Sequence, residues 1–440
     1  MAKPRTTEKK LRVVCIGAGL SGLTIAYKLK HEKPLDFLDL TIYEKNPEVG
    51  GTWFENIYPG VACYQFPFAP NPAWSSCYAS GKEIQEYIVS TAEKYDLKEK
   101  IKFNTKLVKA IWCETQGKWK LQLQQGGLII EDEADIVLDG SGVLNQWKWQ
   151  EIEGLDTFKG KLLHTARWDP EYNYEGKKIA VLGNGSSGIQ VIPSLQPNAA
   201  KLEKQRFQDN PDEFLEYRKS IEGAINNVYN AMISGSEESK ALYEWVQGVM
   251  RSRLSKNPEL EDNSRIAFSK INRITPNGIE TDEGEEEFDL IVCATGFNYS
   301  FIPPWELIGR DSRRLDEGWK DTAEAYFATC AAKVPNYFIF GGPNYPSFPS
   351  NSRQELISSR PVVVKDSVVH AYNKFAQETL KRCVWSKGCH AWYNKRNEGA
   401  DNTVTAMYPG SVLHFKEKLR PEHFEIQYNT SNPFRFMGNG

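Results

Sequence analysis

The chain has 440 residues, 40% of them hydrophobic and 12% aromatic, which is enough apolar surface for a large core divided among two or three domains. A net charge of −3 excludes the strongly basic field that attracts nucleic acids or anionic membranes. The eight cysteines lack metal-binding or disulfide-framework spacing, and no leader or membrane span is evident, so we expect a reduced cytoplasmic protein without a metal site.

The first informative stretch is LRVVCIGAGLSG, residues 11–22. It predicts a short buried strand and then a turn with glycines at 17, 19 and 22, the spacing GxGxxG. In this pattern the first glycine permits the tight turn, the second lets backbone approach a pyrophosphate, and the third lets the following helix pack on the strand. The helix then begins with free N–H groups directed at the phosphates.

The context of this turn makes it more specific. A helical pattern follows, and then a strand, LDLTIYEK, that ends in Glu44. Glu44 lies at about the spacing expected for the carboxylate that binds a ribose hydroxyl, and an acid there favours FAD or NAD over NADP. The alternative is a solvated glutamate at the end of a strand.

A long irregular stretch, residues 45–80, is rich in glycine, proline and aromatic residues, which is typical of a functional loop. Gly50 and Gly51 would let backbone approach a ligand, and aromatic residues such as Trp53 would enclose a flat ring or simply pack.

Ser80 and Glu83 then predict a capped helix. Residues 101–142 alternate as strands, with a turn at Gly126 and Gly127.

The same strand and glycine pattern recurs in KKIAVLGNGSSGIQ, with glycines at 183, 185 and 188. Two such turns imply two nucleotide-binding domains and a redox enzyme with two cofactors. A third buried strand, FDLIVC, ends near Thr295 and Gly296, and we expect it to return the chain to the first cofactor. The expected fold is α/β, with two Rossmann-like domains and the second inserted into the first.

The expected domain limits follow from these patterns. Residues 1–150 form the first part of the FAD domain, residues 151–288 the NADPH domain, and residues 289–440 the return segment with the C-terminal region. The polar helical stretch 208–262 is expected to form a cap on the inserted domain.

These features together resemble the class B flavoprotein monooxygenases, and most closely the Baeyer-Villiger monooxygenases. The matching segments are GAGLSG, GGTW, FKGKLLHTARWD, GNGSSG and CATGF. The third segment carries the signature FxGxxxHxxxW(P/D) of the Baeyer-Villiger enzymes, here Phe158, Gly160, His164, Trp168 and Asp169. From spacing alone, His164 would be a structural histidine.

The resemblance implies two cofactor sites. The FAD site would comprise Gly17, Gly19, Gly22, Glu44, Gly51, Thr52 and Trp53, together with Thr295 and Gly296 from the strand pattern. The NADPH site would comprise Gly183, Gly185, Ser186, Ser187 and Gly188. In relatives NADPH reduces the flavin, and molecular oxygen then supplies the atom that enters a ketone or soft heteroatom of a small organic substrate.

The chain departs from the family pattern in several places. Tyr64 stands where an Asp usually follows the cysteine, the stretch 199–211 replaces an apolar strand ending in Arg, and 255–270 replaces the segment with the catalytic Arg. The stretch 347–367 has no family counterpart either. Lys204 and Arg206 could substitute for the first missing Arg.

Catalytic residues are therefore not assigned from the sequence, although Arg273 and Arg265 are candidates for the missing catalytic cation. The main hypothesis is an NADPH-using FAD monooxygenase. The alternatives are a flavoprotein that has lost oxygenation, acting as an NADPH oxidase, isomerase or non-catalytic remnant, and a mis-spliced form of a longer enzyme.

Overall fold

The computed structural model describes the greater part of the chain. These residues are 10–58, 61–62, 64–75, 78–147, 149–183, 185–195, 228–254, 271–282, 284–345, 363–387, 393–395, 402–411, 414–415 and 417. Within them, the predicted α/β architecture with two nucleotide-binding sheets is confirmed.

The first domain is built on a parallel five-stranded sheet. Its strands, in spatial order, are β17 (Tyr337–Ile339), β9 (Ile136–Asp139), β1 (Leu11–Ile16), β2 (Leu38–Tyr43) and β5 (Ile101–Lys102). The strand with the first glycine turn, β1, is central, so its two neighbours end beside that turn. This places the turn at the carboxyl edge of the sheet, where ligands of such folds bind.

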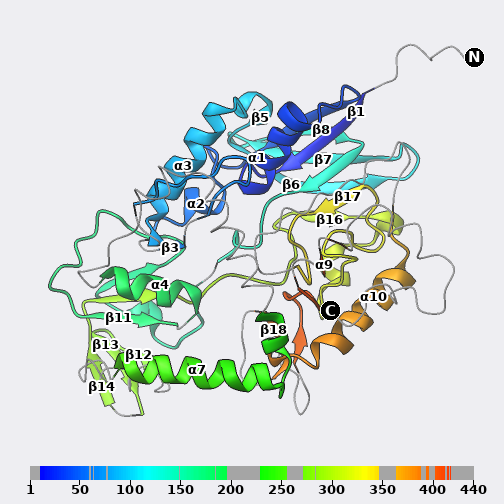
Figure 1. Cartoon of the computed structure of the whole chain (residues 1–440). Helices are drawn as coiled ribbons and strands as arrows, with labels where there is room; N and C mark the ends of the chain where they lie inside the picture. Colours follow the sequence, from blue (N-terminus) through cyan, green and yellow to red (C-terminus); the bar gives the residue numbers. More distant parts are fainter. Residues whose placement is uncertain are drawn as a thin grey trace, which may run out of the picture.

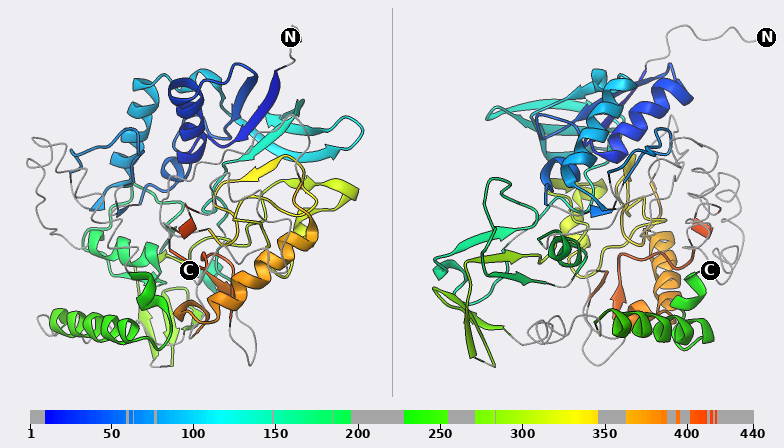
Figure 2. Two further views of the ribbon diagram at one scale, coloured as in Figure 1. Left: turned by 45° about the vertical axis from the view of Figure 1, so that its right-hand side comes forward. Right: turned by 60° about the vertical axis from the view of Figure 1, so that its left-hand side comes forward.

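The two faces of this sheet are buried against different layers. Val13 and Cys15 of β1 pack with the helices α1 (Leu20–Tyr27) and α3 (Gly81–Lys94). Val14 of the same strand packs against a mixed, largely antiparallel sheet on the other side. Its strands are β16 (Glu306–Ile308), β6 (Thr105–Cys113), β7 (Lys118–Gln125) and β8 (Leu128–Ala134). Figures 1 and 2 show most of these layers in blue and cyan, with β16 and β17 in yellow tones.

The capped helix predicted after residue 80 is confirmed as α3. The Ser80 side chain accepts a hydrogen bond from the Glu83 N–H at 3.1 Å. Short elements complete this part of the chain. They are η1 (Lys28–Glu32), α2 (Thr52–Glu55), β3 (Val61–Ala62), β4 (Tyr78–Ala79) and η2 (Lys98–Lys100).

The second domain has a parallel three-stranded sheet in the order β10 (Lys161–His164), β15 (Leu290–Cys293) and β11 (Ile179–Leu182). The helix α4 (Ser186–Leu195) follows the second glycine turn. An antiparallel sheet of β12 (Ile271–Ile274), β13 (Gly278–Thr281) and β14 (Gly284–Glu287) adjoins it, with η3 (Leu155–Thr157) nearby. Figure 1 shows this domain, in green, below the first.

The position of β15 differs from the expected return of the chain at residue 289. β15 pairs in parallel with β10 and β11, so it is the central strand of the second sheet. The chain returns to the first domain only after Cys293 and reaches β16 and then β17. A buried apolar strand fits either sheet, and its neighbours decide which one it joins.

The expected helical cap is seen in part. Its described part comprises η4 (Val228–Met232) and α7 (Glu237–Leu254), whereas residues 208–227 and 255–262 of the predicted stretch lie outside the described residues. The C-terminal region comprises η6 (Arg310–Ser312), α9 (Leu315–Gly318), α10 (Asp366–Leu380), η7 (Val384–Ser386), β18 (Asn394–Lys395) and β19 (Thr403–Val404). The Ser234 N–H donates to the Arg382 carbonyl at 2.8 Å, so the cap contacts the end of α10. Among the described helices, none is long and apolar enough to cross a membrane.

Candidate functional site

The two glycine turns have nearly the same local geometry. A Cβ on Gly22 would lie 2.1 Å from the Gly17 carbonyl oxygen, and a Cβ on Gly188 would lie 2.2 Å from that of Gly183. Both distances are far below van der Waals contact with backbone, so only glycine lets each helix pack on its turn. The sequence pattern therefore has the same physical cause in both domains.

Glu44 lies at the carboxyl end of β2 and is only 3% exposed. Its Oε2 accepts a hydrogen bond from the Ala18 N–H at 2.7 Å, and its Oε1 accepts one from the Asn46 N–H at 2.9 Å. Burial raises the pKa of Glu44, whereas the two N–H groups lower it. The carboxylate is therefore attached to the glycine turn itself, which excludes a merely solvated strand end.

Replacing Glu44 with alanine is expected to weaken FAD binding by about 1.5 to 3 kcal/mol, the range for hydrogen bonds to a charged group. The physical reason is twofold, because the variant loses the ribose acceptor and leaves the Ala18 N–H without its partner. Flavin fluorescence titration of the apoprotein measures the dissociation constant. Asp39→Ala is the matched control, since Asp39 is an exposed acid on the same strand. Equal constants for both variants would contradict the assignment.

The loop after β2 closes over the first turn. A Cβ on Gly19 would lie 3.4 Å from the Cα of Gly51, so the two glycine segments are in close approach. Thr52 begins α2, and the buried Trp53 ring lies 5.1 Å from the Tyr64 ring, centre to centre. GGTW is thus adjacent to the first glycine turn. The Trp53 ring itself packs against Tyr64.

The second turn is more open. Nothing lies within 4 Å of a Cβ placed on Gly185, and Ser186 begins α4 directly after it. Gly185 and Ser186 are exposed and Ser187 is half-buried, so this end of the helix is accessible. Within the described part of the chain, β11 pairs with β15 on one edge only. The stretch 199–211, with Lys204 and Arg206, lies outside the described residues.

Thr295 and Gly296, which the sequence assigns to the FAD site, lie beside the second glycine turn. Both follow β15, and a Cβ on Gly183 would lie 2.4 Å from the carbonyl oxygen of Ala294. The segment therefore adjoins the second glycine turn, in the same way that Gly140, after β9, adjoins Gly17 at 2.7 Å. The equivalent segment of the first domain is Asp139–Gly142, for which the sequence made no prediction.

The fingerprint residues surround β10. Phe158 is buried in the core of the second domain, Gly160 directly precedes the strand, and His164 ends it. Trp168 is buried in the larger core that includes both sheets. Asp169 accepts a hydrogen bond from the Lys161 ammonium at 2.6 Å, which lowers the pKa of Asp169. The five residues therefore hold β10 and its connections in place.

His164 contacts both chain segments that connect the domains. Its ring stacks on Trp147 at 4.7 Å between centres, and its Nε2 lies 3.2 Å from the Thr295 hydroxyl. Because Nδ1 accepts from the Ala166 N–H at 3.1 Å, the neutral ring carries its proton on Nε2 and donates it to Thr295. Burial lowers the pKa of His164 to about 4, so this histidine is neutral near pH 7.

This burial predicts a pH dependence of stability. The folded protein protonates His164 only near pH 4, whereas the unfolded residue does so near 6.5, so unfolding takes up a proton between these values. Stability is therefore complete above about pH 6.5 and falls by up to about 3 kcal/mol towards pH 4.

Urea unfolding of the wild type and His164→Gln between these pH values measures the effect. The glutamine variant should lose less stability on acidification, while the exposed His370→Gln control should follow the wild type. Parallel curves for all three proteins would contradict the prediction.

One direct contact joins the two turn regions. The Tyr58 hydroxyl, from the loop after GGTW, donates to Gln190 Oε1 on α4 at 2.9 Å. Tyr58 is buried, and the larger core continues from Ile42 of the first sheet to Val191 of α4 and Val292 of the second sheet. The aromatic loop therefore positions the second turn relative to the first, a role that its composition alone does not reveal.

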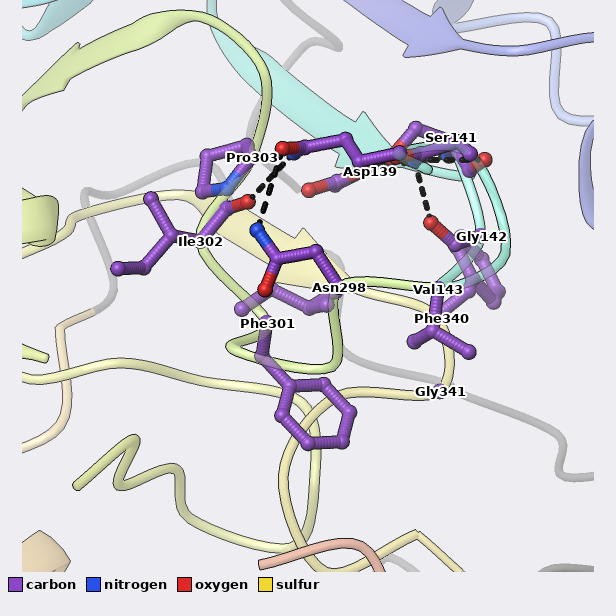
Figure 3. Close-up of a pocket in the computed structure, with 13 residues that line it drawn as sticks. Asp139, Ser141, Gly142, Val143, Asn298, Phe301, Ile302, Pro303, Phe340 and Gly341 are labelled. Atoms are coloured by element: carbon purple, nitrogen blue, oxygen red, sulfur yellow. Dashed lines mark hydrogen bonds between the residues drawn. The ribbon is translucent and has the colours of Figure 1, made fainter. Parts of the chain in front are cut away.

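Asp139 is a buried acid that was not predicted from the sequence as a site residue. It ends β9, accepts from the Ser141 N–H and hydroxyl at 3.1 and 2.6 Å, and accepts from the Tyr337 hydroxyl at 2.8 Å. Burial raises the pKa of Asp139. Figure 3 shows it at the edge of a cavity of about 30 Å³. An acid at the end of an apolar strand, as at Glu44, is the signal that could have indicated it.

Of the two candidate catalytic cations, the structure describes only Arg273. Arg273 lies on β12 of the antiparallel sheet, with its guanidinium 2.8 Å from the Glu280 carboxylate and half its side chain exposed. Its charge is therefore compensated at the surface, and Arg265 lies outside the described residues. No group of three metal-ligating side chains occurs in the ranges that the structure describes.

Comparison with known proteins agrees with this geometry. The flavin-binding monooxygenase-like family matches residues 9–203. The chain is 55% identical to an FAD-binding monooxygenase of Aspergillus terreus, with 99% of this chain and 93% of that protein covered. It is also 32% identical to a Baeyer-Villiger monooxygenase of Pseudomonas aeruginosa, with 97% and 93% covered.

Among solved structures, the chain is similar to cyclohexanone monooxygenase from Rhodococcus sp. Phi1 bound to NADP+. The TM-score is 0.73 at 21% identity, covering 94% of this chain and 97% of that one, which supports the fold. The alignment with the Aspergillus terreus protein extends over 520 positions, so at least 80 of them have no counterpart in this 440-residue chain.

Proposed function

This chain belongs to the class B flavin-binding monooxygenases, and we propose that it uses NADPH and FAD to oxygenate a small organic substrate. In this reaction two electrons come from NADPH, one atom of O2 enters a ketone or a soft heteroatom, and the other atom leaves as water. The Baeyer-Villiger relatives and the fingerprint at Phe158 to Asp169 favour this chemistry.

FAD fits the first glycine turn. Gly19 has no side chain where backbone must approach the pyrophosphate, α1 begins directly behind it, and Glu44 is buried at the strand end where a ribose hydroxyl would bind. Gly51 and Thr52 would face the cofactor from the loop above. Bound FAD would supply the redox and oxygen chemistry, which protein side chains alone lack.

NADPH fits the second turn, where Gly183, Gly185 and Gly188 form the cradle and Ser186 and Ser187 begin α4. These groups bind pyrophosphate, which NADH and NADPH share, so they give no preference between the two cofactors. Such a preference needs a cation near the end of the next strand. We infer weak discrimination against NADH, because the family Arg has no match in this chain.

The observation that carries the proposal is the pair of glycine turns with matching geometry, one in each sheet, joined through Tyr58 and Gln190. The protein itself contributes binding, orientation and a neutral His164 between the segments that connect the domains. The free cysteines at 15, 293, 330 and 383 are consistent with a reducing compartment, which we propose is the cytoplasm.

Anaerobic titration with NADPH tests the proposal most directly. The purified protein should be yellow with non-covalent FAD released by heat, and NADPH should bleach the oxidised flavin absorbance. A folded protein that neither carries nor takes up FAD, or whose flavin NADPH does not reduce, would contradict the proposal.

A second candidate function is NADPH oxidation without oxygenation, in which NADPH and O2 yield NADP+ and hydrogen peroxide. The at least 80 aligned positions without a counterpart favour it, as does Arg273, which is paired with Glu280 at the surface. Measuring peroxide together with oxygenated product distinguishes the two functions.

A further inference from the structure

Two segments carry the chain between the domains. The first crossing segment, residues 140–154, leads from β9 to the second sheet, and the second crossing segment, residues 294–305, leads from β15 back to β16. Any change in the placement of one domain relative to the other must pass through these segments.

Gln146 of the first crossing segment forms three hydrogen bonds to the second crossing segment. Its backbone carbonyl accepts from the Asn298 N–H at 2.8 Å. Its side-chain Nε2 donates to the Ile302 carbonyl at 3.0 Å, and its Oε1 accepts from Asn298 Nδ2 at 3.3 Å. Figure 3 shows Asn298 and Ile302 close together on this segment.

Two backbone groups of known polarity fix the orientation of both side-chain amides. The Ile302 carbonyl can only accept, so Gln146 must present its Nε2 there and its Oε1 to Asn298. Asn298 then directs Nδ2 to Gln146, because its Oδ1 accepts from the Ser300 N–H at 3.0 Å. The network is therefore satisfied in one orientation only, which makes it specific.

The second crossing segment also packs against the first domain, where Phe301 and Ile302 contact its core. A cavity of about 30 Å³, large enough for water, lies between them and the ends of β9 and β17. Its wall includes Asp139, Gly142, Phe301, Phe340 and Gly341. The Gln146–Asn298 pair adds a specific polar connection to these apolar contacts.

We propose that Gln146 and Asn298 are positioning residues that join the two crossing segments into one unit and thereby set the placement of the NADPH domain relative to FAD. The proposal rests on the proposed function, because the two turns must be in register for hydride transfer. Neither residue contacts the glycine turns in the described structure. Their effect is on geometry, and errors of about 1 Å in reacting groups can cost about 100-fold in rate.

The test compares Gln146→Ala with Gln150→Ala, which removes an exposed glutamine of the same crossing segment. Stopped-flow measurement under nitrogen gives the rate of flavin reduction at saturating NADPH. Gln146→Ala should reduce this rate by about tenfold or more, with FAD content and the NADPH dissociation constant unchanged. Asn298→Ala should add little to Gln146→Ala, because both variants remove the same interaction.

Hydrogen exchange followed by mass spectrometry provides the second readout, on the same proteins without NADPH. In Gln146→Ala, exchange should accelerate in 296–303 and also at the interdomain contact, residues 186–195, while Gln150→Ala matches the wild type. Faster exchange confined to residues 296–303, with an unchanged rate of flavin reduction, would show that the hydrogen bonds stabilise only their own segment. This outcome would overturn the proposal. If NADPH does not reduce even the wild type, the proposed function fails, and exchange at 186–195 alone decides the positioning role.

Discussion

Gly185→Ala is expected to prevent efficient reduction of the bound flavin by NADPH while FAD content and thermal stability stay unchanged. A Cβ at this position meets nothing within 4 Å, so the folded chain accommodates alanine without strain. The same methyl group occupies the space through which a pyrophosphate approaches the backbone. An added methyl of this kind typically costs 1 to 3 kcal/mol, or about 10- to 200-fold in NADPH affinity.

The matched control is Gly248→Ala, because Gly248 lies on α7 and a Cβ there also meets open space. This control should bind NADPH as the wild type does and gain slightly in stability, since alanine favours helix over glycine. Anaerobic titrations of the three proteins at equal FAD content give the comparison. Wild-type NADPH affinity in Gly185→Ala would show that the second turn does not hold the cofactor.

The second candidate function predicts that in air the wild-type enzyme converts most of the NADPH that it consumes into hydrogen peroxide and only a minor part into oxygenated product. Oxygen transfer requires a positive charge placed in advance near the reacting oxygen, and such charge is worth about 3 to 4 kcal/mol, or some 100- to 1,000-fold in rate. The family Arg and the Asp after Cys63 have no match in this chain. Arg273 is 2.8 Å from Glu280 at the surface of another sheet.

The measurement compares NADPH consumed, peroxide formed and product formed for a panel of ketones and sulfides. Catalase serves as a control, because it should return half of the consumed oxygen when peroxide is the main product. Arg273→Gln should leave the peroxide yield unchanged. Product formed in a one-to-one ratio with NADPH would contradict the prediction and would place an effective cation in the site.

Much of the architecture could be predicted from the sequence because its signals are local. GxGxxG at residue 17 and again at residue 183 requires glycine for reasons of contact within a few residues, Gly22 against Gly17 and Gly188 against Gly183. Ser80 and Glu83 likewise specify the start of α3 by one hydrogen bond. Glu44 could be identified because a strand-end acid has a fixed spacing from the turn.

The tertiary contacts of these elements could not be predicted from the sequence. The strand FDLIVC is apolar enough to be buried in either sheet. Only its parallel pairing with β10 and β11 assigned it, together with the following Thr295, to the second domain. Asp139, like Glu44, is an acid at the end of an apolar strand. Its hydrogen bond from the Tyr337 hydroxyl, however, joins residues 198 positions apart. For Tyr58, composition predicted either contact with a flat ring or packing, but not the hydrogen bond of its hydroxyl to α4.

The sequence by itself thus determined the two nucleotide turns, the strands and helices that follow them, and the family to which they belong, because each signal depends on neighbours along the chain. Only the tertiary structure decided which sheet each strand joins and how the two turns are connected. It also showed that His164 is neutral between the crossing segments and that Gln146 bonds to Asn298. These properties depend on burial and on contacts between residues more than 100 positions apart, which no local pattern specifies.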